Sequence, residues 1–508
     1  MPNNPKQVEK LVRYIEENLR ASKSAGIEFV DPRNFQTRLT TRQNHAVFGR
    51  RGAGKSTLVT SINKMHNCVI VQLNLEDYKD VSFPNIILHI LLASFKNLRN
   101  EIKRRNPWYK FNFPAFDLCN ALKEEETKLK NELYEPDKKE EQVRDKVSGE
   151  REAALAGGHS SIGVKGRSKR GYEKEISRVV PRDKLDFLRL ELTNFKDLFD
   201  KASTICKNEP IFLVFDDFYF VSKEFQPDLI DYFHRLTKDT NLFIKIATIK
   251  HRSRLYRRDK GNYIGVELGH DIHAIDMDYT LDNFEDLTSF MHLLLGSANR
   301  ASGANLEIDE LFMGDGFTQL CLASGGVPRD FLSLFVDLVN KSVRLESRGI
   351  GKIEVTEAAI ANVNSKIDSF RKDTGSEENI LEKYLNTIKD FVYTEKRTNA
   401  FLVAKNDFQN FPQEAQAIRE LIDSRLIHLV EKSTSSAPSD GLQYEAYIID
   451  ISLYDSSRPR DFNQIEPGEA DAKSRKDKIR SAPKLSLKKI SQEKKQAGIQ
   501  KELLLSEE

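Results

Sequence analysis

Apolar residues follow two alternating patterns along the first half of this chain. Apolar runs predict strands at 46–48, 68–73, 210–215 and 242–250. The run at 210–215 is unbroken, which predicts a strand covered on both faces. Between the runs, apolar positions spaced three or four residues apart predict helices at 86–95, 185–199 and 229–236. Strands that alternate with helices imply a parallel sheet with helices on both faces, which is an α/β fold.

The second half of the chain and the N-terminus are mostly helical in pattern. A helix is predicted from Lys6 to Leu19, and four more, at 281–295, 311–323, 329–343 and 355–371, would form a small helical lid. Further helical stretches at 380–391 and 412–427 precede two strands, 427–430 and 444–453, around a turn at 433–441. Helices followed by a two-stranded hairpin predict a winged-helix domain.

These patterns divide the chain into five parts. We predict an N-terminal helix and linker at 1–40, an α/β core at 41–275, a helical lid at 276–375 and a winged helix at 376–456. The polar, lysine-rich residues 457–508 predict a disordered basic tail.

Residues 98–185 interrupt the α/β pattern as a charged insertion. Residues 123–145 are dense in Glu and Lys and predict an exposed helix. The Gly-, Ser- and base-rich residues 156–171 fit a DNA or partner contact and a solvated loop equally well. Lys103–Arg105 are followed by four aromatic residues, which are Trp108, Tyr109, Phe111 and Phe113. Basic residues beside aromatic ones can bind single-stranded nucleic acid, but we expect these aromatics to pack on the body of the protein.

Composition narrows the class of protein. The 508 residues carry a net charge of +2, so any nucleic-acid surface must be local. The four cysteines fit no metal or redox spacing, and no apolar run is long enough to span a bilayer, so we expect a cytoplasmic protein with reduced thiols. His270 and His273 have no further ligand nearby, so we expect no metal there.

The segment 48–57 carries the clearest chemical signal. It matches G-x-x-x-x-G-K-[ST] after a predicted strand and before a predicted helix, and its members are Gly49, Arg50, Arg51, Gly52, Ala53, Gly54, Lys55, Ser56 and Thr57. Such a loop aims backbone N–H groups and a helix N-terminus at phosphate. Lys55 supplies a charge for the β- and γ-phosphates, and Ser56 supplies a hydroxyl for Mg²⁺. We therefore predict that the chain binds ATP and Mg²⁺.

A second signal lies at the end of the buried run 210–215. Asp216 and Asp217 follow it, where side chains of a parallel strand face the ligand crevice. Asp216 would hold Mg²⁺ through its water shell, and Asp217 would orient or deprotonate the attacking water. The alternative is a strand that ends in a helix cap.

Together these features resemble AAA+ P-loop ATPases of the origin-recognition/initiator clade, with features of STAND-type ATPases, over about residues 30–455. The element Ser324–Asp330 resembles the Gly-x-Pro-Arg of that clade, which makes Arg329 the sensor-2 residue. Thr248 resembles the sensor-1 residue, with Lys250 as a rival. The resemblance also implies oligomers in which one arginine acts on the neighbouring subunit, with four candidates: Arg252, Arg254, Arg257 and Arg258.

Three features depart from that clade. Asp217 stands where many AAA+ proteins have Glu, which suggests slow hydrolysis. The insertion at 98–185 lies outside a minimal initiator core. The predicted recognition helix, 414–425, carries at least as many acids as bases, which leaves a protein client as plausible as double-stranded DNA.

The sequence thus predicts an ATPase that acts as a molecular switch, controlling DNA association or assembly with a partner protein. By analogy, prokaryotic defence is one setting for such a switch. The alternative is a nucleotide-stabilised scaffold or STAND-type sensor with negligible turnover and a protein client. A small-molecule phosphotransferase fits less well, because such enzymes lack this lid, winged helix and tail.

Overall fold

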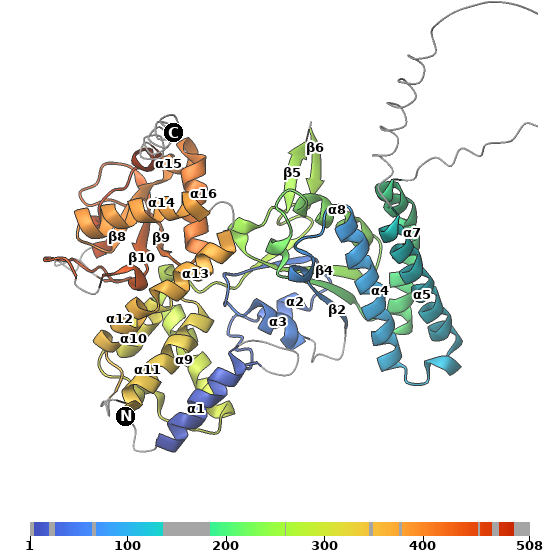
Figure 1. Ribbon diagram of the computed structural model, residues 1–508, viewed down its shortest axis with the longest axis horizontal. Helices are drawn as coiled ribbons and strands as arrows, with labels where there is room; N and C mark the ends of the chain where they lie inside the picture. The colour runs from blue at the N-terminus through green and yellow to red at the C-terminus, as the bar shows by residue number, and fades with distance from the viewer. Residues whose placement is uncertain are drawn as a thin grey trace, which may run out of the picture.

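The computed structural model describes residues 5–19, 26–62, 68–135, 183–259, 261–344, 349–374, 378–455, 458–469 and 477–491 (Figure 1). Its centre is a five-stranded parallel sheet in the order β2-β3-β4-β1-β7. The strands are β1 His45–Phe48, β2 Val69–Asn74, β3 Ile211–Asp216, β4 Leu242–Thr248 and β7 His273–Asp276. The predicted α/β class and parallel sheet are confirmed, and β7 is an additional strand that the sequence pattern did not reveal.

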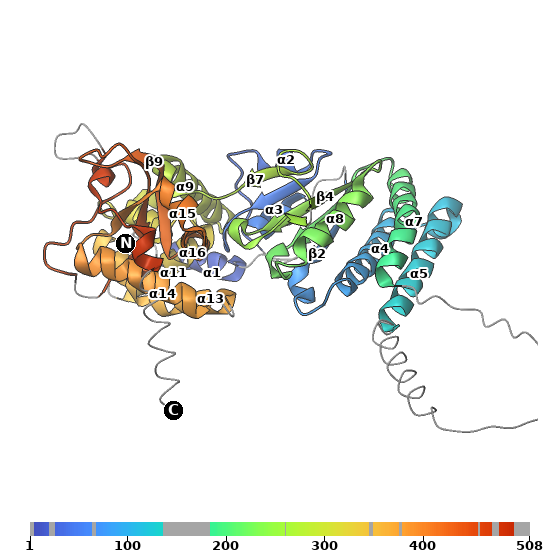
Figure 2. The same cartoon turned by 90° about the horizontal axis from the view of Figure 1, so that it is seen from above.

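Both faces of the sheet are covered, which explains the unbroken apolar run at 210–215. Along β3, Ile211, Leu213 and Phe215 pack into one cluster, whereas Phe212 and Val214 pack into a cluster on the opposite face. Helices α4 Asn85–Arg105, α7 Lys184–Ile205 and α8 Gln226–Thr237 contribute to the first cluster. Helices α2 Phe35–Leu39 and α3 Lys55–Ile62 cover the other face (Figure 2).

The described part of the insertion is a folded extension of this core. Helix α5 Phe113–Tyr134 packs on α4 and α7, and Arg99 of α4 forms an ion pair with Glu126 of α5 at 2.6 Å. Residues 136–182, which include most of the Glu- and Lys-rich stretch and the segment 156–171, lie outside the described residues.

The expected packing of the aromatics in this region is wrong for three of the four. Trp108, Phe111 and Phe113 are 76%, 78% and 77% exposed, and only Tyr109 packs against the core. The reason is local, because the α4–α5 connection lies at the end of the helical hairpin, beyond the reach of the sheet and its helices.

The lid consists of α9 Phe284–Ala301, α10 Gly316–Ala323, α11 Pro328–Arg344, α12 Lys352–Ala361 and α13 Val363–Thr374. The N-terminal helix α1 Pro5–Asn18 packs on α9 and α11. Its predicted helical stripe, Val8, Leu11 and Ile15, is buried in the same cluster as the lid. The predicted N-terminal part therefore packs as a piece of the lid.

The C-terminal unit contains helices α14 Glu378–Lys389, α15 Lys405–Asn410 and α16 Pro412–Asp423. Its antiparallel sheet has the order β8-β10-β9, with β8 Ala400–Ala404, β9 Ile427–Ser435 and β10 Gln443–Ile449. Strands β9 and β10 pair where the sequence predicted a hairpin, and β8 is a third strand that was not predicted. Assignment of this unit as a winged helix stays a prediction.

The predicted disorder of residues 457–508 is wrong for the part that the structure describes. Leu485, Leu487 and Ile490 are buried, and the Leu485 N–H donates to the carbonyl of Leu402 in β8. These apolar residues lie among the lysines at 484, 488 and 489, and burying them outweighs the polar composition that predicted disorder.

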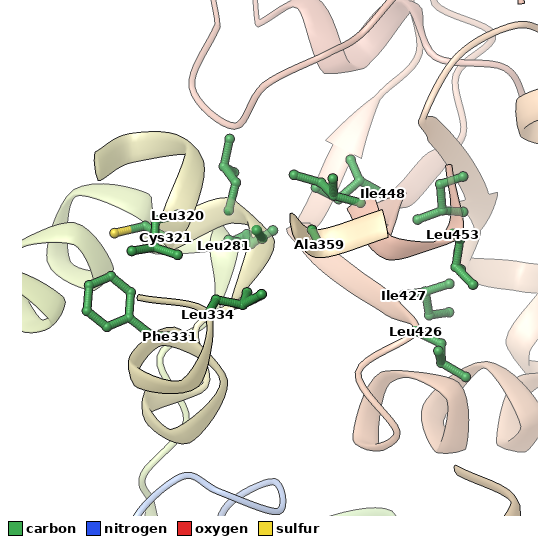
Figure 3. Close-up of a cluster of buried hydrophobic side chains, with 14 of the residues drawn as sticks. Leu281, Leu320, Cys321, Phe331, Leu334, Ala359, Leu426, Ile427, Ile448 and Leu453 are labelled. Carbon is green, nitrogen blue, oxygen red and sulfur yellow. The ribbon is translucent and has the colours of Figure 1, made fainter. Parts of the chain in front are cut away.

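One apolar cluster joins the lid and the C-terminal unit. Figure 3 shows lid side chains such as Leu320 and Leu334 facing Leu426, Ile427 and Ile448 of the C-terminal unit. The two parts therefore share a buried core. None of the helices in the described residues has both the length and the apolarity to cross a membrane.

Candidate functional site

The Gly-rich loop lies between β1 and α3, at the carboxyl edge of the sheet. Gly52 and Gly54 have φ angles of +91° and +93°, which only glycine adopts without strain. The Gly49 N–H donates to the Thr248 carbonyl at 3.2 Å, which fixes the start of the loop to β4. The loop thus turns tightly above the sheet and leads into the N-terminus of α3, which is a geometry suited to an anion.

Lys55 is buried beneath this loop. Its Nζ donates to the carbonyls of Gly49 and Arg50 at 2.8 and 3.2 Å. Burial lowers the pKa of Lys55, and the carboxylates of Asp217 and Asp216 oppose that shift. The ammonium group therefore lies among the loop and the two acids that the sequence singled out.

Asp216 is the last residue of β3, and its side chain lies near Lys55 and Ser56. Its carboxylate accepts a hydrogen bond from the Ser56 hydroxyl and interacts with Gln72 of β2. Burial raises its pKa, and the hydrogen bond from Ser56 and the charge of Lys55 oppose this. Because the Ser56 and Asp216 oxygens already meet, they form a pair of hard donors that fits Mg²⁺.

Asp217 begins the loop after β3 in a left-handed conformation, with φ of 54°. Burial and the adjacent Asp216 raise the pKa of Asp217, whereas Lys55, Arg51 and Arg329 act in the opposite direction. The strained backbone turns the carboxyl group into the cleft beside the loop rather than continuing the strand.

Arg329 enters the cleft from the lid. It is the second residue of α11, and its N–H donates to the Gly52 carbonyl at 3.3 Å. Together with Lys55, Ser56, Asp216 and Asp217, it lines a cleft of about 1140 Å³. The structure thus brings together residues from the core and the lid that are more than 100 positions apart in sequence.

Thr248 lies at the end of β4, next to the site but turned aside. Its hydroxyl forms a hydrogen bond with the hydroxyl of Ser253. Lys250, the rival for this role, lies 3.6 Å from Asp276 and is half exposed. Neither side chain lines the cleft.

The four candidate arginines have different surroundings. Arg252 is buried against the C-terminal unit and donates to the Ser424 hydroxyl at 3.3 Å. Arg257 is held by Asp228 at 2.9 Å. Arg254 and Arg258 are exposed, the latter on the hairpin of β5 Tyr256–Asp259 and β6 Asn262–Gly265.

Arg50 was predicted to line the phosphate site because it lies within the Gly-rich motif, but its side chain points elsewhere. Its side chain is buried away from the cleft and donates to the carbonyls of Gly325 and Tyr279, both at 2.8 Å. Its N–H donates to Asp278 at 2.9 Å. Arg50 therefore ties the phosphate loop to the lid.

Several cleft residues were not predicted. Gln72 and Asn74 come from β2, and Lys96 and Asn100 come from α4. Asn74 lies opposite Asp216 in the register of β2 and β3. Asn74 could have been predicted as a cleft residue, because it is a polar residue at the end of a strand adjacent and parallel to β3. The residues on α4 gave no such signal, because their approach depends on how that helix crosses the sheet.

The start of α11 also contacts the C-terminal unit. Asp330, next to Arg329, accepts from Arg425 Nη1 at 2.7 and 2.8 Å. On the core side, the His251 N–H donates to Asp423 at 3.1 Å, and Gln416 of α16 donates to the His251 carbonyl at the same distance. The C-terminal unit is therefore bonded both to the lid helix that carries Arg329 and to the segment after β4.

The donor set fits the cofactors that the sequence predicted. Backbone N–H groups, Lys55 and Arg329 suit a triphosphate, and the Ser56 and Asp216 oxygens suit Mg²⁺, which uses few protein ligands beside phosphate oxygens. A cluster of three or more His, Cys, Asp or Glu side chains able to hold a metal is absent from the described residues, including those around His270 and His273.

No family model matches the sequence, and no curated protein matches it. Among solved structures, the chain is similar to Drosophila ORC bound to DNA, with 12% identity and a TM-score of 0.35 over 89% of this chain and 92% of that one. It is similar to the ORC2 protein of Aeropyrum pernix in complexes with ADPNP and ADP, with 10% identity and a TM-score of 0.35 over 89% and 91%. The chain is also similar to a Walker-type ATPase of Pyrococcus abyssi, with 12% identity and a TM-score of 0.34 over 89% of this chain and 94% of that one. These likenesses are too distant to carry a function, which must come from the residues themselves.

Proposed function

We propose that this protein is an ATP-dependent molecular switch that binds ATP with Mg²⁺ and hydrolyses it slowly. The observation that carries the proposal is the convergence of Lys55, Ser56, Asp216 and Asp217 of the core with Arg329 of the lid on one cleft. A phosphate loop, paired acids and an arginine from a second body are the parts that nucleotide-dependent closure requires.

Each residue has a distinct role in this proposal. The loop N–H groups and Lys55 neutralise the phosphates, and Ser56 and Asp216 hold Mg²⁺, which supplies charge neutralisation during phosphoryl transfer. Asp217 orients water, and its raised pKa brings it nearer to the range in which a carboxylate accepts a proton. Thr248 supports this site through β4 and Gly49 rather than by lining the cleft.

Arg329 links nucleotide to movement. A γ-phosphate attracts the guanidinium, which draws the start of α11 toward the loop, whereas ADP lacks that attraction. Asp330 follows Arg329 and is bonded to Arg425, so a displacement of α11 is transmitted to the C-terminal unit. The output of the switch is then the position of this unit.

Contacts of α16 favour a protein client over DNA for that output. The predicted recognition helix faces the core, where Gln416 contacts His251 and Glu420 pairs with Lys223 at 3.1 Å. Both of its arginines are paired, Arg419 with Glu445 at 2.9 Å and Arg425 with Asp330 at 2.7 Å. A helix that binds DNA needs lysine or arginine side chains that are not already in ion pairs, because these contact the phosphates. DNA association would therefore require α16 to leave this position.

ATP turnover measured with and without double-stranded DNA, across a salt series, tests the proposal. We expect slow phosphate release in the wild type, and DNA stimulation that collapses with salt would identify a DNA client. Asp217→Asn is expected to abolish turnover and keep ATP affinity, and Lys55→Ala is expected to lose both. Absence of nucleotide binding by calorimetry would refute the switch itself.

A nucleotide-stabilised scaffold is the second candidate. The shorter Asp217 side chain and its strained backbone favour it, because both reduce alignment of the attacking water. Wild-type protein that binds ATP but releases no phosphate under any of these conditions would establish the scaffold in place of the switch.

In the proposed switch, an arginine of one subunit can also act on the ATP site of a neighbouring subunit. Arg252 and Arg257 are held within their own chain, so Arg254 and Arg258 are the better candidates to reach a neighbouring site. Arg258→Ala and Arg254→Ala should each be compared for turnover at low and high protein concentration. A contribution from a neighbouring subunit appears only at the higher concentration.

A further inference from the structure

The α4–α5 connection presents an unusual group of exposed aromatic side chains. Trp108, Phe111 and Phe113 are each more than three-quarters exposed, and the rings of Trp108 and Phe111 lie 6.2 Å apart. Exposed large apolar side chains in a contiguous group mark an interaction site. We call residues 107–116 the aromatic tip.

The aromatic tip and its immediate flanks carry a small positive charge, because the lysines at 103 and 110 outnumber the exposed Asp117. Lys103 lies over the Tyr109 ring at 5.2 Å, and Lys110 is exposed between the aromatics. The nearby Glu101 is neutralised by Arg104 at 2.6 Å. An occupant of the aromatic tip therefore needs an apolar surface with acidic groups at its margin.

The same chain offers a surface of that kind between the lid and the C-terminal unit. A cleft of about 1030 Å³ has apolar walls from Phe284, Leu293, Phe317 and Val430. Leu293 is 47% exposed in it. We call this the lid cleft.

The described residues that line the lid cleft include four acids and neither lysine nor arginine. The acids are Asp282, Glu285, Glu431 and Asp477. Asp282 is paired with Lys432 at 2.6 Å. Burial and the nearby carboxylate of Asp477 raise the pKa of Glu431, whereas a hydrogen bond with Thr434 and the charge of Arg480 oppose this shift. The four acids therefore exceed the two bases beside them, Lys432 and Arg480.

We propose that the aromatic tip of one copy of this chain docks in the lid cleft of a second copy. The two surfaces are complementary in three respects: one projects and the other is hollow, both are apolar at the centre, and their charges are opposite. They lie at opposite ends of the molecule, with α4 and α5 at the right and α9 and β9 at the left in both Figures 1 and 2. Contact within one copy is therefore excluded, and head-to-tail contact between copies remains.

The area available is sufficient for a specific contact. Three large aromatic side chains bury roughly 450–750 Å² when fully covered, of which about three-quarters is still exposed here. The flanking Pro107, Lys110, Pro114 and Phe116 are also exposed and raise the total toward the ~800 Å² per partner of a standard interface. The proposal is independent of nucleotide, because neither surface includes residues of the ATP cleft.

Two variants, each with one surface removed, test this contact. The tip variant carries Trp108→Ser with Phe111→Ser, and the cleft variant carries Leu293→Arg. All three side chains are exposed, so folding is expected to be retained, and circular dichroism verifies it. Leu190→Ser, a 61% exposed apolar residue on α7, is the matched control.

Sedimentation velocity without nucleotide should show concentration-dependent association of the wild type and the control. Each variant alone should associate at least tenfold more weakly, since aromatic anchors at an interface contribute most of its affinity. An equimolar mixture of the two variants should give a dimer, because the cleft variant retains its tip and the tip variant retains its cleft.

Three results would overturn the proposal. They are a wild type that stays monomeric, association unaffected by either variant, and a mixture that fails to form dimers although both variants are folded. The tip variant is also compared with the wild type for binding to anionic phospholipid vesicles and to single-stranded oligothymidylate. Loss of either binding, with self-association unchanged, would assign the aromatic tip to that ligand instead.

Discussion

Substitution of Asp330 by Asn should separate nucleotide binding from movement of the C-terminal unit. Asp330 and Arg425 have side-chain exposures of 15% and 10%, and one guanidinium nitrogen donates to both carboxylate oxygens at 2.7 and 2.8 Å. Asn keeps one acceptor but removes the charge, so the loss corresponds to a charged hydrogen bond, about 1.5–3 kcal/mol. This lowers the equilibrium constant for docking the C-terminal unit on α11 by roughly 10- to 150-fold.

Energy transfer between two dyes measures that equilibrium. The four native cysteines are buried, so cysteines introduced at the exposed Asn120 of α5 and Gln409 of α15 accept the dyes selectively. In the wild type we expect transfer efficiency to change when ATP replaces ADP. In Asp330→Asn that difference should shrink, while ATP affinity stays within about threefold because Asp330 does not line the cleft.

The matched control is Asp186→Asn, which breaks an exposed pair with Arg189 at 3.2 Å in α7. An exposed pair contributes about 0–1 kcal/mol, so this variant should behave as the wild type does. Asp330 has no such coupling role if Asp330→Asn preserves the full ATP-dependent change in transfer, or if this variant loses ATP affinity as severely as Lys55→Ala does.

Three further outcomes are expected. Arg329→Ala should weaken ATP binding by roughly tenfold or more and ADP binding much less, measured by calorimetry, because a hydrogen bond to the γ-phosphate is lost; equal effects on both nucleotides would contradict this role. Gly325→Ala should lower the melting temperature, since φ is +56° and a Cβ would overlap the ring of His428; an unchanged melting curve would show that the two units are not packed there. Burial and Asp278 raise the pKa of Asp423 to about 7, so the folded state keeps a proton that the unfolded state releases above about pH 4. Stability should therefore fall as pH rises from about 4 to 7 and level off above that, and Asp423→Asn should flatten this fall in denaturant titrations by up to roughly 1.4 kcal/mol for each pH unit. A variant with the same pH profile as the wild type would place the titration elsewhere.

The α/β core was predictable because its signals are local. A strand buried on both faces has to be apolar throughout, as 210–215 is, and a phosphate loop needs its glycines and Lys55 at fixed spacing. The residues at the ends of such strands then follow from topology, which is why Lys55, Asp216 and Asp217 meet as expected. Strand β7 was missed because only Ile275 of its four residues, His273–Asp276, is buried, so the segment has no apolar run that would predict a strand.

Features that depend on contacts between distant segments were not predictable. Nothing near Arg50 shows that its side chain turns to Gly325, and nothing near residue 485 shows a partner in β8. The aromatics at 108–113 looked like core residues, since large apolar side chains usually are. Their exposure depends on how far the α4–α5 hairpin extends beyond the sheet.

Docking of α1 on the lid has a consequence for biogenesis. This helix is synthesised before the helices α9 and α11 that cover Leu11 and Ile15, which begin about 270 and 310 residues later. At about 5–20 residues per second, the apolar stripe waits roughly 14–55 s for α9 and roughly 16–62 s for α11. During that interval a nascent-chain chaperone has a defined target, and the core is free to fold before α1 packs on the lid.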